Sequence, residues 1–246
     1  MRIKAVGLAA IAGSALFCFG LPAFGQDVVS VEYTGSYSTT WGNSGGDYGA
    51  GIYSATINGA TSPGIICDDF NDEITTGETW NANAYQASSL ASGNIGSTLF
   101  GNTIGLSGYA EVATLVSLMF GNGTTYGGIT GITQAELSSA IWDITTPGGV
   151  SGLDAKATAL VASVELAFTG NLSKATSYLA GLTNLWILTP DPLTGVGSGE
   201  PQEMWTEALG VPEGGTAFMF LLLAGVSCFG AMFFKYRNQL GNRESA

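Results

Sequence analysis

An uncharged apolar segment near the C-terminus constrains this chain most. Residues 216–234 form a run of 19 residues without a charge, and the bases Lys235, Arg237 and Arg243 follow it. As a helix this run would extend about 28 Å, close to the thickness of the hydrocarbon core of a bilayer. It has no polar face, which a core helix of this length normally shows. We therefore expect a transmembrane helix over 216–234 and a basic tail, 235–246, that stays cytoplasmic.

The N-terminal residues 1–25 have the three parts of a secretory signal peptide. Two bases near the start precede the uncharged apolar stretch 5–21. Ala23 and Gly25 then place small side chains before the expected cleavage point, between Gly25 and Gln26. An uncleaved N-terminal anchor is the alternative. The region between the two apolar segments is expected to be exported through the inner membrane.

The expected exported region, 26–210, is strongly acidic. It carries two lysines, Lys156 and Lys174, against 17 acidic residues, a net charge of −15. This charge argues against a protein that grips nucleic-acid phosphates. The chain has no histidine, which excludes histidine-based triads, histidine-ligated zinc and histidine acid–base catalysis. Cys67 is the one cysteine of this region, so the region cannot contain an intrachain disulfide.

A short motif, Val211-Pro212-Glu213-Gly214-Gly215, precedes the expected transmembrane helix. The motif (211–216), the expected helix and the basic tail span residues 211–246. Together they resemble the PEP-CTERM sorting signal of Gram-negative bacteria. Members usually carry Pro-Glu-Pro, and Gly214 stands where the second proline would be. The resemblance implies recognition by an exosortase, a membrane protease, with a cut near Pro212-Glu213. It also implies transfer to the cell surface or release, and an association with exopolysaccharide or biofilm.

The first part of the exported region predicts β structure. Apolar and polar residues alternate there, as in half-buried strands, and Asn58-Gly59 is a strong hairpin turn signal. The expected strands are 28–33, 53–57, 64–70 and 79–85. The expected loops, rich in glycine, serine and asparagine, are 42–51 and 92–105.

The second part predicts helices, because its apolar residues recur with a 3.6-residue period. Thr133 and Glu136 form a capping box that begins one of them, and Pro147 ends it. The expected helices are 109–120, the capped helix, 153–168 and 172–179, and later strands are expected over 184–188 and 202–205. The alternative is a domain that ends near Leu188. We predict an α+β fold with a β-rich N-terminal half, sandwich or barrel-like, on which the helices pack, plus one C-terminal transmembrane helix.

The densest group of acids in the chain is Asp68, Asp69, Asp72 and Glu73. Their carboxylates could hold Ca²⁺ at the end of a strand. The EF-hand spacing is absent, because Ile74 stands where the turn glycine would be if Asp69 began the loop. The alternative is a solvated acidic loop. No other cofactor is expected.

Cys67 at a strand end, followed by a helix with Ala140-Ile141-Trp142, resembles bacterial thioester adhesion domains. In that family a cysteine and a glutamine form an internal thioester that captures nucleophiles. Ser138 stands where the family has its glutamine, and Gln134 lies one turn upstream. The resemblance implies a related fold with Cys67 as a buried hydrophobe, or a thioester if Gln134 replaces the missing residue.

Catalysis has little support in the sequence. Glycoside hydrolysis needs a pair of acids, and the candidates are Asp68, Asp69, Asp143 and Glu136 only. The chain also has no Gly-x-Ser-x-Gly motif, which would indicate a serine nucleophile. Five tryptophans could stack on sugars, of which Trp41, in a predicted loop, is the best exposed candidate. Trp142 and Trp186 are expected in the core.

We therefore expect a non-enzymatic surface or matrix protein that is sorted through its C-terminus. Its expected partners are an exosortase, the membrane and extracellular polysaccharide, and not nucleic acid. The alternatives are a carbohydrate- or cell-binding adhesin, with or without a requirement for Ca²⁺, and an exported hydrolase.

Overall fold

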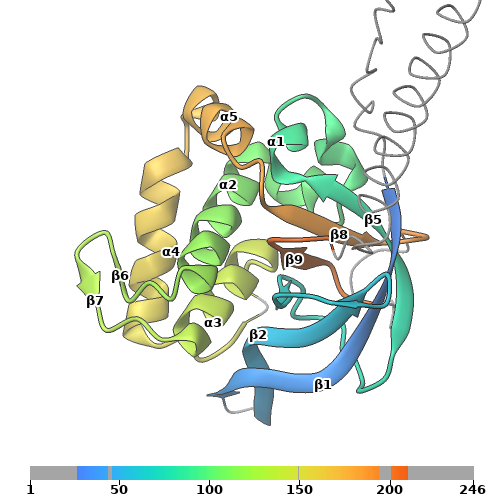
Figure 1. Ribbon diagram of the computed structural model, residues 1–246. Helices are drawn as coiled ribbons and strands as arrows, with labels where there is room; N and C mark the ends of the chain where they lie inside the picture. The colour runs from blue at the N-terminus through green and yellow to red at the C-terminus, as the bar shows by residue number, and fades with distance from the viewer. Residues whose placement is uncertain (1–26, 44–45, 149, 194–200, 210–246) are drawn as a thin grey trace, which may run out of the picture.

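A sheet that closes on itself forms one half of the fold. The computed structural model describes residues 27–43, 46–148, 150–193 and 201–209. The strands of the sheet are β1 (Asp27–Asn43), β2 (Gly46–Ile57), β3 (Ala60–Thr61), β4 (Ile66–Cys67), β5 (Thr79–Gln86), β8 (Trp186–Pro190) and β9 (Met204–Thr206). They are ordered β3-β2-β1-β5-β8-β9-β4. Tyr53 of β2 and Ile65, beside β4, exchange backbone hydrogen bonds of 2.8 and 2.9 Å, so the two ends of the sheet meet and it becomes barrel-like, as predicted (Figure 1).

Helices form the other half and lie on one side of the sheet (Figure 1). The longer ones are α2 (Gly101–Phe120), α3 (Gln134–Thr145), α4 (Ala155–Phe168) and α5 (Leu172–Ala180). The short elements are α1 (Ala87–Leu90), a 3₁₀ turn over Asn94–Ser97, and a hairpin of β6 (Thr125–Tyr126) and β7 (Ile129–Thr130). Helix α2 packs against α3, α4 and α5 and so occupies the centre of this half.

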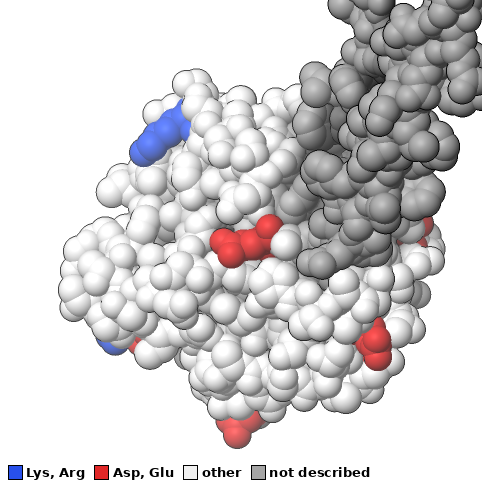
Figure 2. Space-filling view, viewed as in Figure 1, with Lys and Arg blue, Asp and Glu red and all other residues white. Residues whose placement is uncertain are grey.

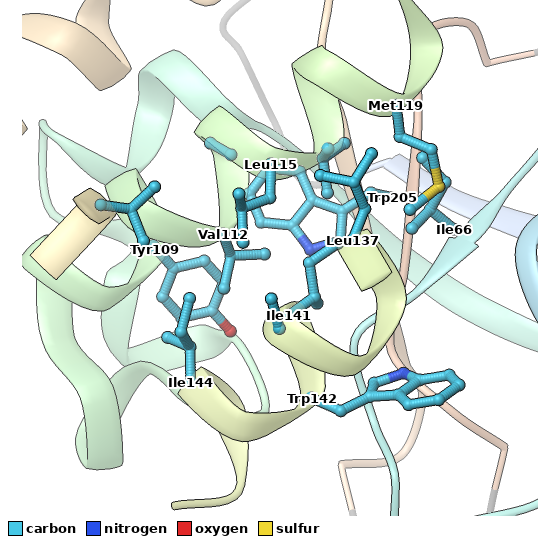
Figure 3. Packing of buried hydrophobic residues seen from close by; sticks show 14 of the residues in the cluster. Ile66, Tyr109, Val112, Leu115, Met119, Leu137, Ile141, Trp142, Ile144 and Trp205 are labelled. Atoms are coloured by element: carbon cyan, nitrogen blue, oxygen red, sulfur yellow. The ribbon is translucent and has the colours of Figure 1, made fainter. Parts of the chain in front are cut away.

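Strand alternation separates two apolar cores. One core lies among the strands and includes Cys67, Leu188 and Met204. Their chain neighbours Ile66, Ile187 and Trp205 belong instead to the core shared with the helices. Figure 3 shows Ile66 and Trp205 among residues of α2 and α3. Because successive strand residues face opposite ways, β4, β8 and β9 each contribute to both cores.

Helix α2 is long and apolar enough to cross a membrane by length and composition, and half of its most apolar window is buried inside the fold. It contacts three other helices, and its residues Val112, Leu115 and Met119 are buried. Helix α2 is therefore a core helix. The transmembrane helix expected over 216–234 lies outside the described residues.

Several local predictions are confirmed. Asn58 and Gly59 have φ of 53° and 76°, the left-handed pair that joins β2 to β3. The capping box of α3 is present, with Glu136 N donating to Thr133 Oγ1 (3.2 Å) and Thr133 N donating to Glu136 Oε2 (2.6 Å). The helix predicted over 153–168 begins at Ala155, where Asp154 caps it.

Other predictions are wrong at particular places. The stretch 42–51 is largely strand, because glycines such as Gly49 and Gly51 let β1 and β2 continue past their curved middle. Residues 64–70 do not form one returning strand: Ala60–Thr61 pairs with β2, whereas Ile66–Cys67 pairs with β9. The alternative domain end near Leu188 is also wrong, since β9 lies between β8 and β4 in the sheet.

We predict that Trp205→Ala lowers the free energy of unfolding by about 3–5 kcal/mol. The Trp205 side chain is fully buried, and its Nε1 donates to Asp68 Oδ2 at 2.6 Å. Urea unfolding of the full chain in mild detergent measures the change. The control is Leu166→Ala on α4, where the side chain is 87% exposed; an equal loss in both variants would contradict the role given to β9.

Candidate functional site

A pocket of about 230 Å³ opens where β1, β2 and the segment after β4 meet. It is lined by Tyr33, Tyr37, Asp47, Tyr48, Gly49, Tyr53, Asp69, Phe70, Asp72, Glu73, Ile74, Trp142 and Gln202. Tyr33 and Tyr53 also belong to the core among the strands, so the pocket is the mouth of the barrel-like sheet. Barrel mouths are common places for small-ligand sites.

One wall of the pocket is built from three tyrosines. The rings of Tyr33 and Tyr53 pack edge-to-face with centroids 5.8 Å apart, and those of Tyr37 and Tyr53 do so at 6.2 Å. Tyr53 is fixed further because its hydroxyl donates to Gly49 O at 2.6 Å. Tyr37 is 47% exposed, so its ring is the part of this wall that is open to solvent.

The other wall contains Tyr48, Phe70 and Trp142. The ring centroid of Phe70 lies 5.1 Å from that of Tyr48 and 5.5 Å from that of Trp142. Trp41 packs behind them, 5.9 Å from both Tyr48 and Trp142. The prediction that Trp41 is an exposed sugar-stacking residue is wrong: it is 6% exposed, because β1 extends through it and buries the ring. Of the aromatic residues here, Tyr37 is exposed and Tyr48 and Phe70 are partly exposed. The β-branched pair Thr39-Thr40 before Trp41 was the strand signal that sequence reasoning missed.

Two carboxyl groups lie at the base of the pocket. Asp69 is fully buried, and its Oδ1 accepts from Asn71 N at 3.0 Å. Its carboxyl group also meets that of Asp72, while Asp69 Oδ2 has no hydrogen-bond donor among the described residues. Burial raises the pKa of Asp69 to about 7, with Asp72 adding to the shift and the Asn71 N–H opposing it.

The backbone around these acids is held by Gln202. Its Nε2 donates to Asp69 O at 3.0 Å and also to Asp72 O. The prediction of a solvated acidic loop is therefore wrong for Asp68, Asp69 and Asp72, which are 0%, 0% and 4% exposed. The segment folds inward because its carbonyls meet donors from α3 and β9.

The four acids that suggested a calcium site are not gathered at one point. Asp68 points into the core, Asp69 and Asp72 lie at the base of the pocket, and Glu73 is exposed at its edge. Among the described residues there is no group of three His, Cys, Asp or Glu that could hold a metal ion.

Behind the pocket, Asp68 pairs with a second buried carboxyl group, Glu203. Trp205 Nε1 donates to Asp68 Oδ2, whereas Asp68 Oδ1 has no donor within the described ranges. Burial and the charge of Glu203 raise the pKa of Asp68 well above its usual range. The two carboxyl groups meet, and the raised pKa of Asp68 favours its protonated form, which can donate to Glu203.

Glu203 has a dense set of donors. Thr189 Oγ1 (2.5 Å) and Leu99 N (2.7 Å) donate to its Oε2, and Tyr109 Oη (2.5 Å) donates to its Oε1. Burial raises the pKa of Glu203, and these donors oppose the rise. Sequence reasoning missed this residue, although an acid between Gln202 and Met204 in a predicted strand was a usable signal.

Cys67 and α3 are neighbours in the fold. Trp142 Nε1 donates to Cys67 O at 3.1 Å, and Thr145 Oγ1 donates to Asp68 O at 2.5 Å. Cys67 Sγ is buried and donates to Asp69 O at 2.9 Å. Burial raises the pKa of the Cys67 thiol well above its usual range, so the sulfur is a protonated, weakly reactive thiol.

Gln134 does not occupy the position of the missing family glutamine. Its Oε1 accepts from the Ser38 hydroxyl on β1, and it lines a different cavity, beside Met119 and Leu137. Ser138, the residue at the family position, accepts from Gly51 N at 2.8 Å. The hydrogen bonds of Cys67 and those of Gln134 thus involve different residues.

The other acids considered for catalysis lie apart from this pocket. Glu136 pairs with Lys156 at 3.3 Å in the cap of α3. Asp143 lines a cavity with Glu111 and Glu165 on the helical side. The predicted processing motif (211–216), the cleavage site at Gly25 and Gln26, and the bases of the tail lie outside the described residues.

Comparisons with family models, curated proteins and solved structures found no match to this chain.

We predict that the fold is more stable in mild acid than at neutral pH. Asp68, Asp69, Glu203 and Glu111 all have a raised pKa in the fold, chiefly through burial. The folded chain therefore binds more protons than the unfolded chain between about pH 4 and pH 7, and the free energy of unfolding falls as pH rises through that window. The fall should exceed about 1.4 kcal/mol, the value of a one-unit pKa shift.

Urea unfolding of the full chain in mild detergent across this pH range measures the effect. Asp68→Asn should weaken the pH dependence, because its amide can donate to Glu203 without a proton. Glu207→Gln removes an exposed acid and is the control. A stability that rises from pH 4 to pH 7 would contradict the buried carboxyl pairs.

Proposed function

We propose that this chain is an exported protein, tethered by its C-terminal helix and then processed by an exosortase to a cell-surface or extracellular-matrix form. The observation that carries the proposal is the tail: the 211–216 motif, the uncharged run 216–234 and the bases after it. A leader with the features of a signal peptide supports export of the region between them.

The proposed role of the exported region is non-enzymatic and associated with exopolysaccharide or biofilm. Two of the acids considered for catalysis have structural roles, which supports this proposal: Glu136 serves a helix cap, and Asp68 lies in the core beside Glu203. The protonated, buried thiol of Cys67 supports a structural role for that residue.

A second candidate function, carbohydrate binding, is favoured by the pocket. Its walls present the rings of Tyr37 and Tyr48 beside carboxyl groups, and sugars bind through aromatic faces together with polar groups that fix orientation. This adhesin-like function fits the same cell-surface setting. A polysaccharide is then the expected partner, alongside the exosortase and the membrane.

We predict that deletion of 211–246 abolishes surface localisation. Pro212→Ala and Glu213→Ala should impair it within the intact tail, because they alter the proposed recognition motif. Immunolabelling of intact cells measures surface protein, and Glu207→Ala, an exposed acid just upstream, is the control. Unchanged surface labelling of the deletion variant would refute the sorting proposal.

We predict that the full chain binds oligosaccharides on a glycan array and that Tyr37→Ala weakens this binding. The loss should be roughly two- to tenfold, as expected from an aromatic contact worth about 0.5–1.5 kcal/mol. Tyr126→Ala, in the β6–β7 hairpin away from the pocket, is the matched control. Equal binding by both variants would show that carbohydrate is not recognised in this pocket.

A further inference from the structure

We infer that the pocket at the mouth of the barrel binds an amino sugar that carries a free, positively charged amine. This inference rests on the proposed carbohydrate function and names its ligand class. It is argued from four features of the pocket: its charge, an oxygen without a donor, its aromatic walls and its size.

The lining of the pocket has one sign of charge. Asp47, Asp69, Asp72 and Glu73 line it, and none of its lining residues is basic. The lysines of the described ranges are engaged elsewhere: Lys156 pairs with Glu136, and Lys174 lies over the Phe168 ring. The pocket therefore favours a cationic group over a neutral or anionic one.

The base of the pocket contains a buried carboxyl pair, Asp69 and Asp72, and one Asp69 oxygen takes no hydrogen bond from another group of the described residues. Asp69 is fully buried and lines the pocket. The acid it meets is Asp72, which adds negative charge and supplies no basic partner. A buried acceptor of this kind is costly unless a donor reaches it. An ammonium group has three donors and could bond to Asp69 while neutralising the charge of the pair.

The walls favour an organic cation over a metal ion. Calcium binding requires six to eight oxygen ligands around one point, and the described residues contain no group of three acids that could hold a metal. The lining instead contains four tyrosines, together with Phe70 and Trp142. Aromatic faces attract organic cations through their quadrupoles.

The size of the pocket and the positions of its polar groups favour a sugar over a lysine side chain. The volume of about 230 Å³ is below the roughly 300–1,000 Å³ typical of pockets for drug-sized ligands, so it suits a single ring. Asp47 and Glu73 are exposed at the edge, where they can accept from ring hydroxyls. A lysine side chain has no hydroxyl groups, so it would make no hydrogen bond to these two edge carboxylates, which would stay hydrated.

Isothermal titration of the full chain in mild detergent tests the inference, at a pH where the ligand amine is protonated. The probes are a β-1,4-linked glucosamine tetramer, its fully N-acetylated counterpart, a glucose tetramer, a tetralysine peptide and Ca²⁺. The glucosamine tetramer should bind at least about tenfold more tightly than the other four, because one charge-assisted hydrogen bond is worth about that factor.

Asp69→Asn should remove this preference by weakening glucosamine binding about tenfold. Glu73→Gln, at the exposed edge, should weaken it in the same direction, and it tests the pocket even if the buried Asp69→Asn variant does not fold. Glu207→Gln, an exposed acid outside the pocket, should bind as the unmodified chain does.

Equal affinity for the glucosamine and N-acetylated tetramers would overturn the inference and leave carbohydrate binding standing. Tighter binding of tetralysine or of Ca²⁺ would show that the pocket takes a different class of ligand. Absence of glucosamine binding would refute the inference. None of these results alters surface localisation, which tests the sorting proposal separately.

Discussion

The buried carboxylate of Glu203 is the interaction on which the described fold depends. It joins four separate parts of the chain: Leu99 before α2, Tyr109 within α2, Thr189 in β8, and Asp68 after β4. Its own backbone carbonyl accepts from Asp68 N at 3.3 Å. A buried charge is tolerated only where donors surround it, so β9 can occupy its place in the sheet only when the helices and β4 are already positioned. The sheet and the helical half are thus one cooperative unit.

That constraint also shapes the pocket. Because β9 is fixed beside β4, Gln202 reaches the carbonyls of Asp69 and Asp72 and holds the acidic segment inward. The aromatic walls come from the other end of the closed sheet, through Tyr37 and Tyr53. The carboxyl groups of the site are therefore supplied by one edge of the sheet and the rings by the other, and closure between Tyr53 and Ile65 brings them together.

Local patterns in the sequence were sufficient to predict most helices, the Asn58-Gly59 turn and the α+β class. They were not sufficient where a long-range contact decides the outcome. Trp41 lies in a glycine-rich stretch that resembles a loop, yet it is strand, because β1 pairs with β2 as far as Asn43 and Trp41 lies opposite Tyr48. The acids at 68–72 resemble a solvated loop, yet they are buried, because Gln202 and Trp205, far along the chain, supply their donors. Sequence spacing identified these residues as a cluster and could not state which partners they would meet.

The acidity of residues 26–210 has two separate physical effects. Buried acids such as Asp68 share protons and contribute structure, so they add little to the external field. Exposed acids such as Asp47 and Glu73, on a chain with two lysines between residues 26 and 210, do produce a negative potential. A cleft lined by one sign of charge concentrates ligands of the opposite sign. A net charge of −15 over residues 26–210 therefore repels other copies of this region, and the acidic lining of the pocket is the part of that field on which the proposed amino-sugar binding depends.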